Sequence, residues 1–496
     1  MEKPRPVCAV RSMASRLLSS SWAVSRMPAL APMVLAAALP LAAQTPALTP
    51  HQRLAREIYR ELIEIDTADS TGAVTPAAEA MAARFRAAGF SAEDVRIVVR
   101  DGAPADGNLI VRYRGRGAGK PILLLAHLDV VAALRSDWSL DPFVLTEQDG
   151  YFYGRGTADD KAMAAIFVAN LLRARVEGWV PERDLVLALT ADEENGGDNG
   201  VGWLVKEHRD LLDAELAINE GGGGALRDGK HWYLSVQAAE KLYADFSLTV
   251  TDRGGHSSQP RPDNAIVRLS EGLARLGKHA FPVRLNAVTR AYFTEMARLE
   301  GPATAAAMRA LLRDERDAAA ARKLSVTPRF NATLRTTCTP TQLSGGHAPN
   351  ALPQLATATV NCRITPGETV EQVQAALGRV VADTAIHIAL LPADEPSPPP
   401  EPSALVPAVM GPIGEVTREM FGAGVPVVPF MSTGATDGRF LRSAGIPTYG
   451  VSGLFGDPND VRSHGRDERM LVRSFYEGLE FLDRLVRRVA GGETAS

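Results

Sequence analysis

The chain has 496 residues, of which 45% are hydrophobic and 23% charged, and its formal net charge is -4. So small an excess of negative charge gives no electrostatic basis for binding nucleic acid or an anionic membrane surface, and we expect neither as a partner. The composition is that of a soluble globular protein. The length favours two domains, because it exceeds what one hydrophobic core normally fills.

The segment 1–46 has the character of a targeting signal. Arginines precede an alanine-rich apolar run, Met27–Ala43, which three prolines interrupt. The run is short and proline-rich for a membrane-spanning helix, but it suits the apolar region of a secretory signal peptide. We therefore expect export to the periplasm or the medium after cleavage, with a retained membrane anchor as the alternative.

Strands and helices alternate between residues 47 and 240. Apolar periodicity predicts helices over 50–65, 77–88, 161–174 and 200–208, and strands over 109–113, 121–126, 185–190 and 215–218. The strands at 121–126 and 185–190 are almost unbroken apolar runs, as expected for strands buried on both faces of a parallel sheet. The alternation predicts a doubly wound α/β domain with a mostly parallel sheet.

The pattern changes near Lys241, where strands with alternating polarity begin. Strands are predicted over 243–251 and 356–364, and helices over 264–276, 300–323 and 369–382. A proline-rich stretch, 392–402, is typical of an exit linker. Helices over 412–420 and 469–489 and a strand over 447–451 then return the chain to α/β character. We therefore expect a discontinuous α/β domain, 47–240 and 397–496, interrupted by an inserted α+β domain, 241–396.

Carboxylates gather where the strand at 185–190 ends. Asp192, Glu193 and Glu194 follow it closely, and three adjacent carboxylates at the mouth of a buried strand repel one another. A divalent cation is the usual way to offset such charge, because oxygen-rich clusters are neutralised by a metal or by protonation. By itself the stretch fits either a metal site or an exposed acidic turn, and the other motifs of the chain decide between the two.

Other side chains of metal-binding type also follow apolar strands. The positions together are His127, Glu193–Glu194, Glu220 and His464. We expect them to converge, because the carboxyl ends of strands form the ligand crevice of an open α/β sheet. Imidazoles and carboxylates are the donor set of catalytic Zn²⁺ or Co²⁺, and two such cations need a shared carboxylate. Asp159 and Asp160 open the helix at 161–174, and Asp129 is of the right type to hold the His127 imidazole from behind.

Other chemistries fit the motifs less well. The glycine-rich stretches at 154–156 and 221–224 lack the Lys-Ser/Thr pair of a phosphate-binding loop. A glycosidase needs two separated carboxylates, not histidines in register with them. Ser257 and Ser258 lack the context of a nucleophile elbow.

Several motifs match one family in that family's own order. They are AHLDVV (126–131), GRGTADDK (154–161), ADEENGG (191–197), INEGGGG (218–224), GGHSSQP (254–260), NALP (350–353) with Arg363, STGATDGR (432–439) and SHGRDER (463–469). Together they resemble the M20 family of metallopeptidases, and the long stretch 281–329 is similar to its carboxypeptidase S branch. The resemblance implies a dizinc catalytic domain interrupted by a lid domain that commonly forms a homodimer.

The same resemblance implies two zinc ions per subunit, with Co²⁺ or Mn²⁺ as alternative metals. His127 and Glu220 would bind one ion, Glu194 and His464 the other, and Asp159 would bridge the two. Glu193 would be the general base that takes a proton from the attacking water and returns it to the leaving amine. The Asp159–Asp160 peptide bond would be cis.

Substrate-binding residues are implied mainly in the lid. His256 would polarise the scissile carbonyl from the partner subunit, an oxyanion-type role. Asn350 and Arg363 would hold the substrate carboxylate, for which the planar guanidinium fork is suited. Gly434 and Arg439 would line the substrate side of the catalytic domain.

These expectations describe a zinc-dependent exopeptidase or dipeptidase that cuts small peptides next to a free C-terminal carboxylate. An N-acyl-amino-acid hydrolase is the alternative. A non-catalytic peptide-binding protein is a further alternative, against which the complete ligand set argues. Cys338 and Cys362 could pair in an oxidising compartment, but their spacing does not decide this.

Overall fold

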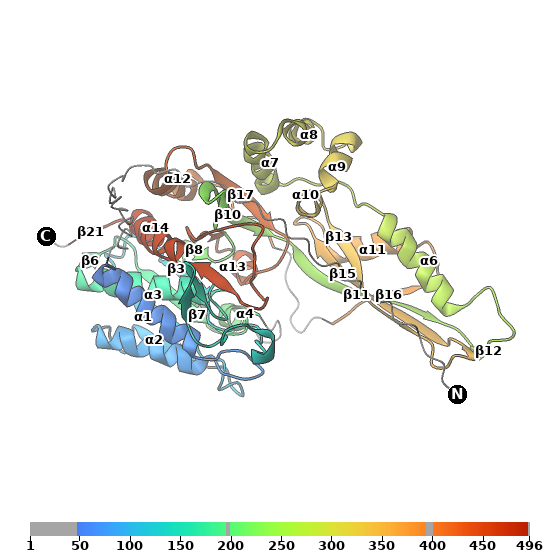
Figure 1. The fold of residues 1–496 in the computed structure, drawn as a ribbon, viewed down its shortest axis with the longest axis horizontal. Helices are drawn as coiled ribbons and strands as arrows, with labels where there is room; N and C mark the ends of the chain where they lie inside the picture. Colours follow the sequence, from blue (N-terminus) through green and yellow to red (C-terminus); the bar gives the residue numbers. More distant parts are fainter. Residues whose placement is uncertain (1–46, 195–198, 393–399, 495–496) are drawn as a thin grey trace, which may run out of the picture. The chain divides into compact units, whose positions relative to one another are not determined.

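The computed structural model describes residues 47–194, 199–392 and 400–494. The signal segment expected at 1–46 and most of the linker expected at 392–402 lie outside the described residues. Figure 1 shows the strands of the central sheet with helices on both sides, and a second group of strands formed by the middle of the chain.

The central sheet is mixed, with a parallel centre. Its strand order is β1-β2-β7-β3-β8-β18-β10-β9-β19, with β17 beside β10. The strands are β1 Val95–Val98, β2 Asn108–Tyr113, β3 Ile122–His127, β7 Leu185–Thr190, β8 Leu216–Asn219, β9 Gly224–Arg227, β10 Lys230–Glu240, β17 Val427–Ser432, β18 Thr448–Gly450 and β19 Phe455–Gly456. The four neighbours β7, β3, β8 and β18 are mutually parallel. Their carboxyl ends therefore lie at one edge of the sheet.

Helices cover both faces of this sheet because alternate residues of its strands are apolar on both sides. In β3, Leu124 and Ala126 belong to the hydrophobic core shared with α3 and α14, whereas Leu123 and Leu125 belong to the core shared with α4 and α13. The first face carries α1 Pro50–Glu64, α2 Thr75–Ala87, α3 Lys161–Val176, α12 Pro407–Phe421 and α14 Val472–Ala490. The second carries α4 Gly200–Glu207, α5 Arg209–Leu212 and α13 Gly438–Ser443. The expected doubly wound α/β domain is confirmed.

The inserted segment contains an antiparallel sheet with the order β13-β15-β11-β16. These strands are β13 Thr337–Gly345, β15 Leu355–Ile364, β11 Leu242–Thr251 and β16 His387–Leu390, and a small ladder joins β12 Gly255–His256 to β14 Ala351–Leu352. Alternate apolar residues of β11 and β15 pack against α6 Ala265–Lys278 and α11 Val370–Val381. Asn264 and Thr369 cap the two helices with side-chain hydrogen bonds to backbone N–H groups.

Four further helices follow α6. They are α7 Ala287–Leu299, α8 Pro302–Arg313, α9 Ala318–Ser325 and α10 Pro328–Leu334. Their apolar faces share a hydrophobic core with Tyr233 of β10 and Val428 of β17 rather than with the lid sheet. The boundaries at 241 and 396 stay a prediction; within them, helices α7–α10 pack on β10 and β17 of the central sheet.

Several element predictions differ from the structure. Helix α12 begins at Pro407 and carries Pro412 inside it, whereas the helix was expected to start at that second proline. Arg469–Leu471 form strand β20, so α14 starts at Val472 and not at Arg469. Strand β20 pairs with β5 Tyr151–Tyr153, which also pairs with β4 Thr146–Gln148. Strands β10, β13 and β17 were not expected. Polar residues or a proline interrupt their patterns, and pairing with neighbours defines them. The remaining short elements are β6 Trp179–Val180, β21 Glu493–Thr494 and the 3-10 turn Arg135–Asp137.

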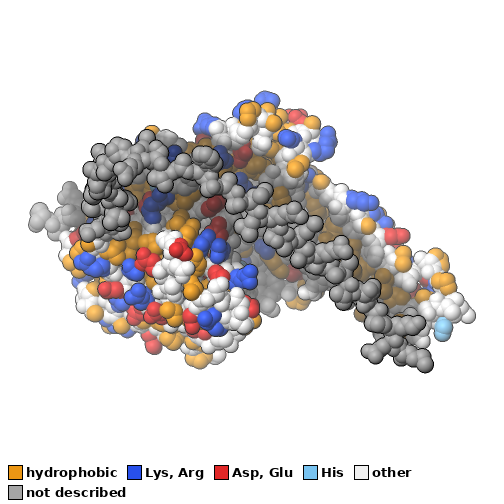
Figure 2. Space-filling model, in the orientation of Figure 1, with side chains coloured by type: hydrophobic (Ala, Val, Ile, Leu, Met, Phe, Trp, Pro, Cys, Tyr) orange, Lys and Arg blue, Asp and Glu red, His pale blue; other side chains and the backbone are white. Residues whose placement is uncertain are grey.

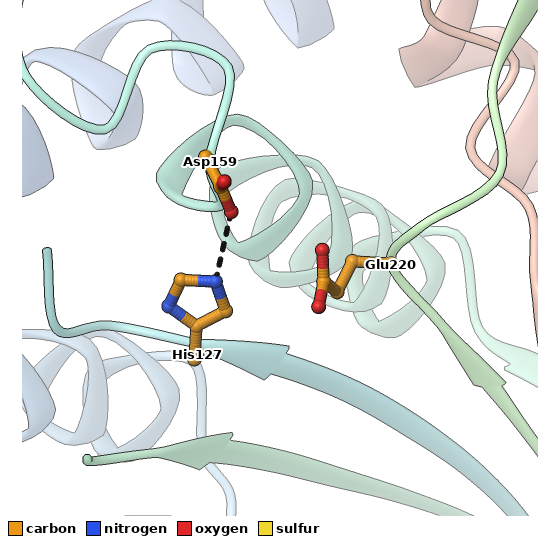
Figure 3. A group of neighbouring side chains, drawn as sticks. All are labelled: His127, Asp159 and Glu220. Atoms are coloured by element: carbon orange, nitrogen blue, oxygen red, sulfur yellow. Dashed lines mark hydrogen bonds and ion pairs between the residues drawn. The ribbon is translucent and has the colours of Figure 1, made fainter. Parts of the chain in front are cut away.

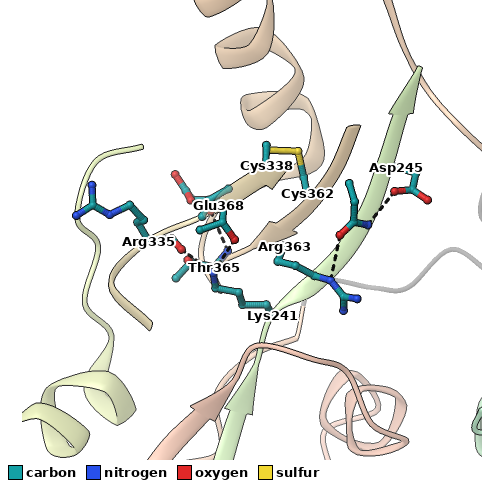
Figure 4. Close-up of a disulfide and its surroundings, with 11 residues drawn as sticks. Lys241, Asp245, Arg335, Cys338, Cys362, Arg363, Thr365 and Glu368 are labelled. Carbon is teal, nitrogen blue, oxygen red and sulfur yellow. Dashed lines mark hydrogen bonds between the residues drawn. A yellow bond between two sulfur atoms is a disulfide. The ribbon is translucent and has the colours of Figure 1, made fainter. Parts of the chain in front are cut away.

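The two cysteines of the lid form a disulfide. Cys338 of β13 lies directly opposite Cys362 of β15 in the antiparallel ladder, and their sulfurs are bonded (Figure 4). The sequence left this pairing open, and the strand register decides it.

None of the helices in the described part of the chain combines the length and apolar character needed to cross a bilayer. On the face drawn in Figure 2, basic and acidic side chains are interspersed over the described surface.

Candidate active site

The expected metal ligands meet at the carboxyl edge of the parallel strands. His127 is the last residue of β3, Glu220 follows β8 directly, and Asp159 precedes α3. Figure 3 shows these three side chains converging on a common space. Glu194 comes from the turn after β7, and His464 from the loop between β19 and β20. Parallel pairing of neighbouring strands therefore brings together residues that are far apart in the sequence.

Two groups of potential ligands share Asp159. One consists of His127, Asp159 and Glu220, and the other of Asp159, Glu194 and His464; in each group the donor atoms lie within 4.8 Å of one another. The His127 Nε2 atom is 3.1 Å from Asp159 Oδ1, and the His464 Nε2 atom is 3.3 Å from Asp159 Oδ2. His464 Nε2 is also 3.0 Å from Glu194 Oε2. Each oxygen of Asp159 thus faces one imidazole, which is the arrangement of a carboxylate that bridges two cations.

The electrostatics of the cluster also fit cations. Burial raises the pKa of Glu220 well above its ordinary value, and the neighbouring carboxylates of Asp159 and Glu193 raise it further. Burial likewise raises the pKa of Glu193, with Asp437 and Glu194 adding to the effect. Positive charge in the space between them would remove this cost. The imidazole and carboxylate donors suit Zn²⁺.

Asp129 supports the cluster differently from the expectation. The Nδ1 atom of His127 is 3.0 Å from the backbone carbonyl of Asp129, and 3.6 Å from its carboxylate. With Nδ1–H donating to this carbonyl, the Nε2 lone pair is directed at the cluster. The carboxylate Oδ2 instead accepts a hydrogen bond from the backbone N–H of Glu194, at 2.9 Å. Asp129 therefore orients a ligand of each group.

The turn after β7 aims the two glutamates. Asp192 adopts a left-handed backbone conformation with φ 62°, which reverses the chain before Glu193 and Glu194. The Asp159–Asp160 peptide bond is cis, as the family resemblance implies. Asp160 is buried and directly precedes α3.

Glu468 is a site residue that the sequence analysis did not single out. Its fully buried carboxylate accepts hydrogen bonds from the backbone N–H groups of Ala158 (2.7 Å), Gly156 (3.1 Å) and Asp159 (3.2 Å). It also pairs with Arg155, whose guanidinium donates to the carbonyl of Gly465. Glu468 thus ties the loop that holds Asp159 to the loop that holds His464. Its position within the SHGRDER motif was the available signal.

His256 and Asn350 lie together in the lid. His256 is paired with Ala351 across the β12–β14 ladder, and its Nδ1 atom is 2.8 Å from Ser258 Oγ. The carbonyl of Asn350 accepts a hydrogen bond from the N–H of Ser257. Both residues are exposed, and among the described residues neither contacts the metal-ligand groups through a hydrogen bond or ion pair.

Arg363 of strand β15 and Arg439 of helix α13 lie close enough for their charges to interact. Arg363 of β15 stacks on Tyr243, with its guanidinium carbon 4.6 Å from the ring centroid. Burial lowers the pKa of Arg363, and the positive charge of Arg439 is one of the charges that act on it. The buried Nε–H of Arg439 has no hydrogen-bond acceptor in the described part of the chain. The structure thus brings two positive charges near each other.

Hydrogen bonds fix the loop that precedes Arg439. Asp437 is buried and accepts hydrogen bonds from Asn199 (2.6 Å) and Thr190 (3.2 Å). The N–H of Gly434 donates to Ser432 Oγ at 3.1 Å. The hydrogen bond from Thr190, the last residue of β7, therefore places this loop against the end of that strand.

A doubly wound sheet with two imidazole–carboxylate groups at its carboxyl edge is the arrangement of a metal-dependent hydrolase. Residues 123–488 match the sequence profile of Peptidase family M20/M25/M40, and the chain belongs to this family. It is therefore an enzyme of a hydrolase family, as the motifs led us to expect.

Three similar proteins illustrate the range of the family. The human N-fatty-acyl-amino acid synthase/hydrolase PM20D1 is 28% identical over 376 residues, which are 74% of this chain and 74% of that protein. The probable carboxypeptidase S-like 2 of Dictyostelium discoideum is 28% identical over 404 residues, 77% of this chain and 74% of that protein. The M20 family metallo-carboxypeptidase Sso-CP2 of Sulfolobus solfataricus has the same fold, with a TM-score of 0.65 and 18% identity over 88% of this chain and 99% of that one.

Proposed function

We propose that the chain is a two-metal amide hydrolase whose substrates carry a free carboxylate on the amine side of the scissile bond. The observation that carries this proposal is the pair of ligand groups sharing Asp159. His127, Asp159 and Glu220 would hold one ion, and Asp159, Glu194 and His464 the other. The ions would be Zn²⁺, with Co²⁺ or Mn²⁺ as alternatives that the same donors accept. Bound cations supply Lewis acidity and lower the pKa of a nearby water molecule.

Glu193 is the proposed general base. It accepts a proton from the attacking water and delivers that proton to the nitrogen of the leaving amine, so one carboxylate serves both steps. Asp129 orients its neighbours through the His127 ring and the Glu194 backbone.

Two arginines, an asparagine and a histidine are the residues proposed to bind and orient the substrate. Arg363 and Arg439 would hold the substrate carboxylate. The buried Nε–H of Arg439 has no acceptor among the described residues, and the positive charge of Arg439 acts on Arg363. Asn350 lies beside His256 and would help to hold the carboxylate from the second copy, and Gly434 belongs to the loop that precedes Arg439 of α13. His256 of a second copy would donate to the scissile carbonyl, which requires a homodimer formed through the lid.

Two substrate classes share this chemistry. The name of the carboxypeptidase S-like relative supports an exopeptidase, and the name of PM20D1 supports an N-acyl-amino-acid hydrolase. Hydrolysis of a dipeptide, compared with that of an N-acyl derivative of the same C-terminal amino acid, separates them.

The proposed location is the periplasm or the extracellular medium. The Cys338–Cys362 disulfide supports it, because such bonds persist in oxidising compartments. The apolar run at 27–43 supports a cleaved signal peptide.

Replacement of Glu193 by Gln tests the mechanism. The amide cannot accept a proton, so we expect kcat to fall by about 10²–10⁴-fold while the protein still binds two metal ions per chain. Metal content is measured by atomic emission spectrometry beside the rate of amide hydrolysis. Glu57→Gln, on the exposed surface of α1, is the matched control and should leave both quantities unchanged. Near-normal turnover by Glu193→Gln would assign the base to another group.

A further inference from the structure

A cavity of about 210 Å³ lies between the inserted helices and the central sheet. Helices α7 and α10 supply Tyr292 and Arg329 to its lining, and strands β10 and β17 supply Tyr233 and Ser432. None of the proposed metal ligands is among the described residues that line it. Pockets for drug-sized ligands have volumes of roughly 300–1,000 Å³, so any occupant of this cavity is smaller than such a ligand.

Hydroxyl groups make up most of the polar lining of this cavity. The residues that carry them are Tyr233, Ser235, Tyr292, Thr333, Ser432 and Thr433. The serine and threonine hydroxyls at positions 235, 333 and 432 form hydrogen bonds with backbone groups of the protein. The two tyrosine hydroxyls and that of Thr433 are therefore the ones in the described lining that remain for a ligand.

Tyr292 supplies the clearest indication that the cavity takes a ligand. The residue is 5% exposed, and its buried hydroxyl has no hydrogen-bond partner in the described part of the chain. A buried polar group left in this state costs free energy, which a bound acceptor removes. Burial raises the pKa of Tyr292, and the positive charge of Arg329 offsets this only in part. The hydroxyl therefore stays protonated at physiological pH and is available as a hydrogen-bond donor.

Arg329 supplies positive charge at the same place. Its Nη1–H donates to the hydroxyl oxygen of Tyr233 at 3.5 Å. No Asp or Glu is among the described residues that line the cavity. The charge of Glu300 acts on Arg329, but more weakly than the two tyrosines do, and the described residues include no ion-pair partner of Arg329. Because Arg329 is exposed, an anion from solvent can reach it. The cavity thus combines a cation and hydroxyl donors with no competing carboxylate in its lining.

We propose that this cavity binds a small oxyanion, either phosphate or the carboxylate of a small organic acid. The guanidinium of Arg329 donates to one oxygen of the anion, and the hydroxyls of Tyr233 and Tyr292 donate to others. Hydrogen bonds to an ionised acceptor are about twice as strong as neutral ones, and the planar fork of arginine fits carboxylates and phosphates alike. The inference goes beyond the proposed amide hydrolase function and does not depend on it, because binding at this site is measured without turnover.

Calorimetric titration of the metal-loaded protein with inorganic phosphate and with acetate tests the proposal, and the tighter of the two identifies the preferred oxyanion. Tyr292→Phe removes only the hydroxyl and should weaken binding of that anion about tenfold or more, because hydrogen bonds to charged groups contribute more than neutral ones. Either anion can also bind the metal ions, so the variants are compared at equal metal content. Tyr476→Phe removes a partly buried hydroxyl from α14, outside the cavity, and is the matched control with wild-type affinity. Binding of neither anion, or equal affinities in Tyr292→Phe and the wild type, would overturn the proposal.

A pair of arginine variants supplies the second measurement. Arg329→Gln removes the cation from the cavity and should also weaken binding of the preferred anion about tenfold or more. Arg322→Gln removes the same charge from the exposed surface of α9, outside the cavity, and should bind as the wild type does. If Tyr292→Phe fails to fold, this pair decides. Equal loss of affinity in the two arginine variants would assign the effect to general surface charge and overturn the site.

Thermal unfolding separates a ligand site from a purely structural cavity. Without added phosphate or acetate, Tyr292→Phe should unfold at the wild-type temperature or above it, because the variant lacks a buried hydroxyl that has no partner in the described structure. The preferred anion should raise the unfolding temperature of the wild type and not that of the variant, since a ligand stabilises only the state that binds it. An equal rise in both proteins would overturn the site. Absence of amide hydrolysis with anion binding intact would overturn the proposed function alone.

Discussion

At the scale of single residues, Glu468 links the two loops that carry the proposed bridging and terminal ligands. Its carboxylate accepts three backbone hydrogen bonds around Asp159 and pairs with Arg155, all away from solvent. A buried charge with this many donors is stable only while its partners stay in place. We therefore predict that Glu468 is a positioning residue, which acts through Asp159.

Glu468→Gln should weaken metal binding while the fold persists. The amide keeps one acceptor oxygen but loses the charge that pairs with Arg155, so we expect metal affinity to fall by about 10–100-fold. Competition with a chromophoric chelator measures the affinity, and thermal unfolding of the metal-free protein checks the fold. Asp467→Asn is the control, because the neighbouring carboxylate of Asp467 bonds to Ser139 and not to the ligand loop. Equal loss of affinity in both variants would remove the positioning role.

At the scale of elements, a disulfide links two neighbouring strands of the lid sheet. Cys338 and Cys362 stand opposite each other in β13 and β15, 24 residues apart in sequence. Strand β15 also carries Arg363, directly after Cys362, so the disulfide links the two strands next to the residue from which this guanidinium extends (Figure 4).

The double variant Cys338→Ala/Cys362→Ala should be less stable. Removing a link that closes a loop of this length restores entropy to the unfolded chain, and we expect the free energy of unfolding to drop by about 2–4 kcal/mol. Urea titration measures it, with native-state thiol labelling as the companion assay. The wild-type protein recovered from the exported fraction should show neither cysteine reactive. Reactive thiols there, with an unchanged urea midpoint in the variant, would contradict a stabilising disulfide.

At the scale of the whole molecule, the active site is predicted to be shared between two copies. His256 lies on the small β12–β14 ladder and contacts Ser258, and it makes no hydrogen bond or ion pair with His127, Asp159 or Glu220 among the residues that the structure describes. A contribution of His256 to catalysis therefore requires a second copy, which a twofold-symmetric lid interface would supply.

Mixing two inactive variants tests this arrangement. His256→Ala and Glu193→Gln are each expected to be inactive, but a mixed dimer contains one site with both residues intact. Random reassembly after equal mixing should restore about a quarter of wild-type activity, because half of the dimers are mixed and each has one working site. Activity is followed after dissociation and reassociation, with each variant reassembled alone as the control. No recovery in a preparation that sedimentation shows to be mixed dimer would exclude a shared site.

The sequence by itself determined the elements whose signals are local. The apolar runs of β3 and β7 are visible as strands because both faces of each are buried, and the side chains that follow such strands are brought together by parallel pairing alone. His127, Glu194 and Glu220 could therefore be predicted to converge, and the family could be recognised from motifs. The prolines of α12 and the polar residues of β10 obscured the same kind of signal.

Only the tertiary structure determined which distant residues are in contact where the sequence contains no pattern that relates them. Strand register joined Cys338 to Cys362, and packing placed α7–α10 on the catalytic strands. Folding buries Glu468, whose carboxylate then accepts hydrogen bonds from the backbone around Asp159, and it forms a cavity beside the ligands. The physical reason is that burial, register and cavity shape depend on which distant segments meet, whereas periodicity and strand-end position depend only on neighbours along the chain.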